Sequence, residues 1–131
     1  MPRGVGEAMA GLAGCIGVCE AALGSNLTAY VSGAASASEF AAWADDDGVR
    51  MPAPMRERIG AAVEVVAIFA ASNQVGMVRA WLREYGAAGA SFTPAGLIRA
   101  ATSHEGFKQV YQAAADFVAQ PRQVLTESQA R

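Results

Sequence analysis

The stretch "PMRERIGAAVEVVAIFAA", residues 54–71, constrains the fold more than any other part of the chain. Its apolar residues recur at spacings of three and four, which is the period of an α-helix with one buried face. These residues are Met55, Ile59, Ala62, Val63, Val66 and Phe69. Pro54 suits the first turn of a helix, where its missing N–H is not needed. We therefore expect residues 54–71 to form the central helix of a helical protein.

Three further helical segments precede the central helix. The first two, at about residues 5–23 and 26–32, each stop at a glycine, the residue that most readily adopts the left-handed conformation ending a helix. The third begins at the capping box "SASE", in which the side chains of Ser36 and Glu39 satisfy backbone N–H groups at the helix start. It stops at "DDDG".

Three more segments follow the central helix. Ser72 or Asn73 caps a fifth helix that stops at Gly86. Thr93, followed by a proline, begins the sixth. A second capping box, "TSHE", begins the seventh, which runs through Ala119. No run of four or more residues alternates apolar and polar outside these segments, so no sheet is expected.

Length and composition agree with this pattern. A chain of 131 residues has the usual size of one domain, and 53% apolar with only 8% aromatic residues suits closely packed helices. The predicted fold class is all-α, a compact domain of about seven helices.

The charge balance and the cysteines limit the range of partners. Ten basic and twelve acidic residues give a formal net charge of −2, so the whole protein does not attract nucleic acid or anionic lipid. The apolar run at residues 8–19 stops at Glu20, short of the roughly 20 residues of a membrane span. Cys15 and Cys19 lack the two further ligands of a metal site, because His104 is the only histidine. We expect a cytoplasmic protein with reduced thiols, no metal, no cofactor and no membrane partner.

No segment has the residue pattern of an active site. His104 lies beside Glu105 at a helix start and is expected at the surface. Asp45, Asp46 and Asp47 lack the alternating ligands and the distant glutamate of a calcium loop, so a solvated helix end is favoured. We therefore predict that the protein is not an enzyme.

The stretch "LTAYVSGAASASEFAAWADDD", residues 27–47, has the outline of a helix-turn-helix. That motif needs a small residue in its first helix, a turn residue that tolerates positive φ, and apolar residues on the inner face of its second helix. Ala29 and Gly33 supply the first two features, and Phe40 and Trp43 the third. We expect Phe40 and Trp43 to be buried against the central helix.

Over about residues 24–119 the chain resembles the small Xre/MbcA/ParS-type antitoxin-like proteins of bacteria. The resemblance rests on the helix-turn-helix stretch, the Arg- and Pro-containing link, the long apolar helix, "VRAWL" and "FTPAGLIRAA", in that order. It implies an Xre-like helix-turn-helix followed by a helical toxin-binding domain. It also implies two activities: sequestration of a partner toxin, often one that degrades NAD, and binding to the protein's own promoter.

On this basis the chain divides into three parts that share one core. Residues 1–71 hold the N-terminal helix, a degenerate helix-turn-helix and the central helix. Residues 72–120 form the partner-binding region, and residues 121–131 form a flexible tail.

The expectation of DNA binding rests on few side chains. The outward positions of the second helix in the motif carry serine and alanine, which make no bidentate contact with a base. The candidates are Ser36, Ser38, Arg50, Arg56 and Arg58, the three arginines as phosphate contacts. The arginines have an equally good interpretation as a solvated face paired with nearby carboxylates. DNA is therefore the less favoured partner.

Exposed charges in the C-terminal half are the candidates for binding a protein partner. They are Arg83, Arg99, His104 and Lys108. Trp81 and Tyr85 belong either to that surface or to the core, and the core is favoured.

The sequence is compatible with three functions. The protein is an antitoxin-like protein that neutralises a co-encoded toxin and weakly regulates its promoter, a regulator that binds DNA as a homodimer, or a helical scaffold with a small-molecule pocket. The first is favoured.

Overall fold

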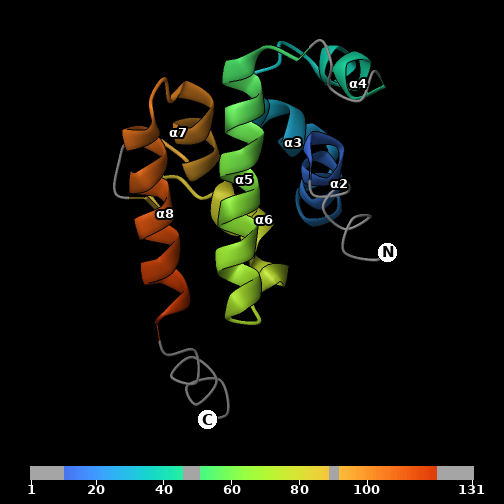
Figure 1. Ribbon diagram of the computed structural model, residues 1–131. Coiled ribbons are helices and arrows are strands. Elements are labelled where there is room, and N and C mark those ends of the chain that lie inside the picture. Colours follow the sequence, from blue (N-terminus) through green and yellow to red (C-terminus); the bar gives the residue numbers. More distant parts are fainter. Residues whose placement is uncertain (1–10, 46–50, 89–91, 121–131) are drawn as a thin grey trace.

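In the computed structural model the described residues are 11–45, 51–88 and 92–120, and within these ranges the fold is all-α, as predicted (Figure 1). The elements are α2 (Leu12–Leu23), α3 (Ser25–Ser32), α4 (Ala37–Asp45), α5 (Ala53–Ala71), the 3-10 helix η1 (Val75–Met77), α6 (Val78–Leu82), α7 (Pro94–Ala100) and α8 (His104–Val118). Among these helices none combines the length and the apolar character that crossing a membrane requires. The predicted helix start near residue 5 lies outside the described residues.

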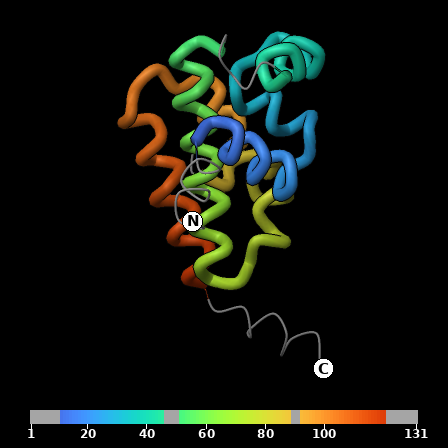
Figure 2. The backbone as a smooth tube through the Cα atoms, turned by 45° about the vertical axis from the view of Figure 1, so that its right-hand side comes forward, coloured from blue at the N-terminus to red at the C-terminus, as the bar shows by residue number. Residues whose placement is uncertain are grey.

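Helix α5 is the centre of the molecule, which confirms the prediction for residues 54–71. It contacts α2, α3, η1, α6, α7 and α8. Figure 1 shows α7 and α8 on one side of α5 and α2 and α3 on the other, with α4 at the far end beside α3, and Figure 2 shows the same arrangement turned by 45°. Ile59, Val65 and Phe69 are fully buried in a core to which every α-helix from α2 to α8 contributes.

Local signals set several of the helix ends as expected. Gly33 closes α3 with φ 94°, and its N–H donates to the Tyr30 carbonyl at 3.1 Å. At the start of α4 the Glu39 N–H donates to Ser36 Oγ (3.1 Å), and Glu39 Oε1 accepts from the Ala35 N–H (2.8 Å). Thr93 caps α7 by accepting the Gly96 N–H at 2.9 Å. Each of these contacts spans five residues or fewer, which is why the sequence alone could predict them.

The predicted start of the fifth helix is wrong. Neither Ser72 nor Asn73 caps it: Asn73 takes φ 58°, and the N-cap of η1 is Gln74, which makes no side-chain cap bond. The Gln74 side chain donates instead to the Val118 carbonyl of α8 at 3.0 Å. A contact with a residue 44 positions away thus organises this turn, where a local cap was expected.

The predicted end of that helix is also wrong. Arg83 and Glu84 donate to carbonyls only three residues back, so α6 closes in a tight turn after Leu82. Tyr85 therefore leaves the apolar stripe of the helix and is 72% exposed. Of the two aromatic residues that the sequence placed in the core or at a partner surface, only Trp81 is buried.

The second predicted capping box does not form. A box in "TSHE" needs Thr102 at the N-cap, but α8 begins one residue later, with Ser103 at the N-cap and no side-chain cap bond. The Glu105 carboxylate lies 3.6 Å from Lys108 Nζ instead. An attraction within the first turn of α8 thus replaces the expected cap.

The aromatic side chains show where the core is deepest. Phe69 of α5 meets Trp81 of α6 at 5.4 Å and Phe117 of α8 at 5.6 Å between ring centroids. Phe40 of α4 is buried as predicted, whereas Trp43 is only half-buried, which corrects the expectation for that residue. Helix α4 packs chiefly on α3 and not on α5 as expected, so the Trp43 position is less enclosed than a place against α5 would be.

Candidate partner-binding surface

Two of the four predicted partner-binding residues come together at one exposed aromatic ring. Tyr30 of α3 is 44% exposed. Arg99 of α7 donates through Nη1 to the Tyr30 carbonyl at 2.7 Å, and its guanidinium carbon lies 4.8 Å from the centre of the Tyr30 ring. A hydrogen bond and a cation–π contact therefore hold the Arg99 head in one place.

Arg79 and Arg83 lie near the same ring. Together with Asn26, Leu27 and Tyr30 they line a hollow of about 290 Å³. The Arg79 guanidinium also lies against Gly24, where an added Cβ would stand 3.7 Å from its central carbon. A Cβ would make an ordinary contact at that distance, so it is the φ of 87° at Gly24 that favours glycine here.

A second hollow, of about 170 Å³, lies next to the first and shares Asn26 and Tyr30 with it. Arg99, Ser36 and the alanines at the start of α4 complete its lining. We call the two hollows and the ring between them the Tyr30 surface. It consists of Asn26, Tyr30, Ser36, Arg79, Arg83 and Arg99.

The Tyr30 surface is a local basic region on an acidic protein. Among the described residues no carboxylate forms an ion pair with Arg79, Arg83 or Arg99. The ion pair that the structure records in the described part of the chain joins Glu105 and Lys108, both on α8. The whole chain has a net charge of −2. The three guanidinium groups are therefore placed to receive an external oxyanion.

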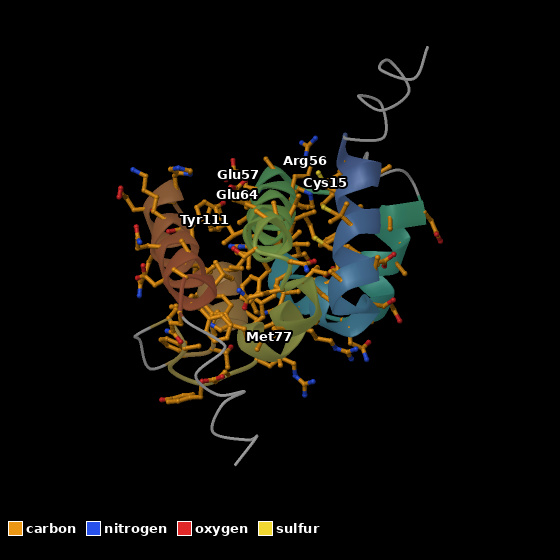
Figure 3. The ribbon with its side chains drawn as sticks, turned by 90° about the horizontal axis from the view of Figure 1, so that it is seen from below. Cys15, Arg56, Glu57, Glu64, Met77 and Tyr111 are labelled. Atoms are coloured by element: carbon orange, nitrogen blue, oxygen red, sulfur yellow. The ribbon has the colours of Figure 1, made fainter. Side chains whose placement is uncertain are left out.

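His104 and Lys108, the other two predicted partner-binding residues, lie on α8 at a different place. His104 lines a groove of about 440 Å³ between α5 and α8, together with Glu57, Gly60, Ala61, Phe107 and Tyr111. Burial raises the pKa of Tyr111, and the charge of Glu64 adds to the rise. We call this region the α5–α8 groove. Figure 3 shows Glu57, Glu64 and Tyr111 together on one side of the molecule and Met77, beside α6, on the opposite side.

The described members of the predicted DNA-binding set lie on α5 and at the start of α4. Arg58 Nη1 donates to the Ser32 carbonyl at 3.4 Å and Nη2 to the Ala101 carbonyl at 3.2 Å. The guanidinium thus ties together the C-terminal ends of α3 and α7, where the helix dipoles favour a cation. Arg56 is exposed, and Figure 3 shows it on the side of α5 that faces α2. Arg50 lies outside the described residues.

The serines of that set lie at the start of α4. Ser36 is occupied as the helix cap described above and lines the hollow beside Arg99. Ser38 is exposed. The carboxylate of Glu39 lies at the same helix end, where it already interacts with the positive end of the dipole.

The cysteines are placed for packing rather than chemistry. Cys19 is fully buried, and its thiol points at the Ile59 carbonyl with Sγ 3.8 Å from the oxygen. Burial raises the pKa of the Cys19 thiol to about 12, and neighbouring Cys15 and Glu20 act in the same direction. Its thiolate, the form that reacts or binds a metal, is therefore disfavoured. In the described part of the chain no three His, Cys, Asp or Glu side chains gather as a metal site.

The comparisons with known proteins add no family. No protein-family model, no curated protein and no solved structure matches this chain. The geometry of the Tyr30 surface therefore carries the functional argument.

Three members of the Tyr30 surface, Asn26, Tyr30 and Arg79, were not predicted as site residues from the sequence. Arg79 stands four residues before Arg83, a spacing that places both side chains on one helix face, and this signal was available. Tyr30 had no such signal, because its partner Arg99 is 69 positions away. Only the packing of α3 against α7 brings the two together.

Proposed function

We propose that this protein is an antitoxin-like binding protein, which holds and neutralises a partner protein encoded beside it. The observation that carries the proposal is the gathering of Arg79, Arg83 and Arg99 around the exposed ring of Tyr30. Tyrosine and arginine are enriched at the centres of protein interfaces, where a few such residues supply most of the binding energy.

The resemblance of the sequence to antitoxin-like proteins supports the same proposal. It implies that the second half of the chain binds the toxin, and two of the three arginines were predicted there as partner contacts. The Tyr30 surface draws on both halves, since Tyr30 belongs to α3 while the arginines belong to α6, its C-cap and α7. The proposed interface thus extends the region expected from the resemblance.

Co-expression with the neighbouring gene tests this function. Each adjacent reading frame is expressed alone and then together with this protein, and growth is recorded. We expect one neighbour to arrest growth alone and to be harmless when co-expressed. If no neighbour is toxic, or if the toxicity persists in the presence of this protein, the proposal is wrong.

A second candidate is a DNA-binding regulator, favoured by the α3–turn–α4 unit with its left-handed Gly33 and its exposed Ser38. Each half of such a dimer must neutralise several phosphates to bind at physiological salt. A gel shift with the promoter of its own gene at low salt tests it, with Ser38→Glu as the variant that adds charge to the exposed face of α4. A shift that Ser38→Glu abolishes would favour this candidate.

A further inference from the structure

We propose that the Tyr30 surface binds an acidic segment of the partner protein, with carboxylate side chains entering the hollows on both sides of the Tyr30 ring. This inference rests on the proposed function and names the chemistry of its partner. The partner is defined by what three guanidinium groups, without a carboxylate partner in the described part of the chain, and a half-exposed aromatic ring recognise.

The first step of the argument is the chemistry of the larger hollow. Arg79 and Arg83 both line it, and among the described residues neither has a carboxylate partner. A guanidinium presents parallel N–H donors that match the two oxygens of a carboxylate, and such charge-assisted pairs are stronger than neutral hydrogen bonds. The Asn26 amide adds a polar group that can bind backbone beside the acid.

The second step is the position of Arg99. Its guanidinium donates one N–H to the Tyr30 carbonyl and lies over the Tyr30 ring. Arg99 also lines the smaller hollow, and the place of its guanidinium is set before any ligand arrives. Because this side chain is already ordered, binding through it costs less conformational entropy than binding through a free arginine.

The third step is the size and spacing of the two hollows. The smaller hollow, at about 170 Å³, falls below the roughly 300–1,000 Å³ of a pocket that encloses a small molecule, and the larger, at about 290 Å³, only reaches the lower end of that range. They suit single side chains of a larger partner. In an extended segment the side chains of alternate residues lie on one face, about 6–7 Å apart. Hollows that share Tyr30 are close enough for two such side chains.

A nucleic acid fits this surface less well. Its phosphates form a long and regular row, whereas the guanidinium groups here surround one ring. The Glu39 carboxylate at the start of α4, beside the smaller hollow, and the net charge of −2 both repel a polyanion. A protein segment can place its few acids where the arginines are and avoid the rest.

A binding experiment with the full chain tests the inference. The probe is a fluorescein-labelled peptide of alternating glutamate and glycine, measured by fluorescence anisotropy at low ionic strength. The reference probes are the matched peptide of alternating glutamine and glycine and a labelled DNA duplex of mixed sequence. We expect the glutamate peptide to bind, the glutamine peptide not to bind, and the duplex to bind more weakly than the glutamate peptide.

Two double variants with the same loss of charge locate the site. Arg79→Ala with Arg83→Ala should weaken binding of the glutamate peptide by roughly tenfold or more, the scale of a lost charge-assisted hydrogen bond. Arg56→Ala with Lys108→Ala should leave it unchanged, because these side chains lie elsewhere. Tyr30→Phe keeps the ring and should bind as the original does, with circular dichroism confirming the fold of every variant.

Other results of these measurements would overturn the inference, and the co-expression experiment separates its failure from that of the proposed function. Equal weakening by both double variants would mean diffuse attraction by charge, and tighter binding of the duplex would make the surface one for nucleic acid. No binding of the glutamate peptide would remove the site. If a toxic neighbour is neutralised while the peptide does not bind, only this inference fails. If the peptide binds while no neighbour is toxic, the proposed function fails and the acidic-ligand site remains.

Discussion

The Tyr30 surface and the α5–α8 groove both carry predicted partner-binding residues, yet their charges are arranged differently. In the groove region Lys108 lies 3.6 Å from Glu105 on its own helix, and His104 shares its lining with Glu57. At the Tyr30 surface Arg79 and Arg83, of α6 and its C-cap, meet Arg99 of α7 without a carboxylate partner among the described residues. Lys108 thus has a carboxylate beside it on its own helix, whereas the packing of α7 adds Arg99 to two arginines of like charge.

The difference matters for binding because an unpaired guanidinium gains more from an incoming carboxylate than a cation that already has a partner. The Tyr30 surface also has a fixed aromatic ring between its hollows, and the groove has a mixed lining of Glu, His and Tyr side chains. Under the proposed function we therefore expect Arg83 and Arg99 to contact the partner, and His104 and Lys108 not to contact it. The following predictions test that division, from the largest expected effect to the smallest.

The largest effect should come from the core beneath both regions. Trp81 lies on α6 between Arg79 and Arg83 in sequence, and its ring is 6.1 Å from Phe117 of α8. Trp81→Ala should lower the free energy of unfolding by about 3–5 kcal/mol, the usual cost of truncating a buried tryptophan. Urea unfolding measures it, with Tyr85→Ala at an exposed position as the control. Unchanged stability together with lost partner binding would make Trp81 a contact residue.

The next effect separates the two regions directly. Arg99→Glu should weaken binding of the co-encoded partner by about 2 kcal/mol or more, roughly thirtyfold, because it reverses an anchor of the Tyr30 surface. Lys108→Glu makes the same change of charge at α8 and should bind normally. Isothermal titration with the purified partner measures both. An equal loss of affinity in the two variants would mean that the interface includes both regions, and the distinction between them would be wrong.

A smaller effect concerns the two hydrogen bonds of Arg58, which hold together the helices that carry Tyr30 and Arg99. Arg58 joins the last carbonyls of α3, which carries Tyr30, to those of α7, which carries Arg99. Arg58→Met should cost about 1–2 kcal/mol of stability, since two hydrogen bonds are lost. Arg58→Lys should recover part of this through its charge at the helix ends. Thermal unfolding distinguishes the roles, because a residue that only contacts phosphate would leave the melting temperature unchanged.

The smallest effect is expected in the groove region. Side chains of Lys108 and Glu105 are 61% and 76% exposed, so water screens their attraction. Lys108→Ala, Glu105→Ala and the double variant should give a coupling energy within about 0.5 kcal/mol. A double-mutant cycle by urea unfolding measures it. A coupling energy well above 1 kcal/mol would show that this ion pair stabilises the fold more than an exposed pair is expected to.

Several features of the fold were predictable because they depend on near neighbours. Ser36 with Glu39 begins α4, and Thr93 begins α7, through bonds between residues at most four apart. Where a distant contact intervened, the same reasoning failed. The Gln74 side chain bonds to α8, and the helix expected to begin at Ser72 or Asn73 is replaced by a turn and a short 3-10 helix.

The candidate site was predictable only in part. Exposed arginines in the second half of the chain were expected at a partner surface, and the structure brings two of them, Arg83 and Arg99, to the Tyr30 surface. The sequence placed Arg58 among phosphate contacts, but it does not show that the guanidinium bonds to carbonyls 26 and 43 positions away. Whether an arginine is free depends on such bonds, which no local pattern encodes.

The sequence by itself thus determined the all-α class, the central position of α5 and several helix ends, because the period of apolar residues and the capping side chains act within a few residues of the backbone they order. The tertiary structure decided which charges are neutralised and which remain available. Helix packing brings Tyr30, Arg79, Arg83 and Arg99 to one surface and places Arg58 between two helix ends. The physical reason is that a guanidinium finds its partners through space, and the distances between helices are set by the shared core rather than by spacing along the chain.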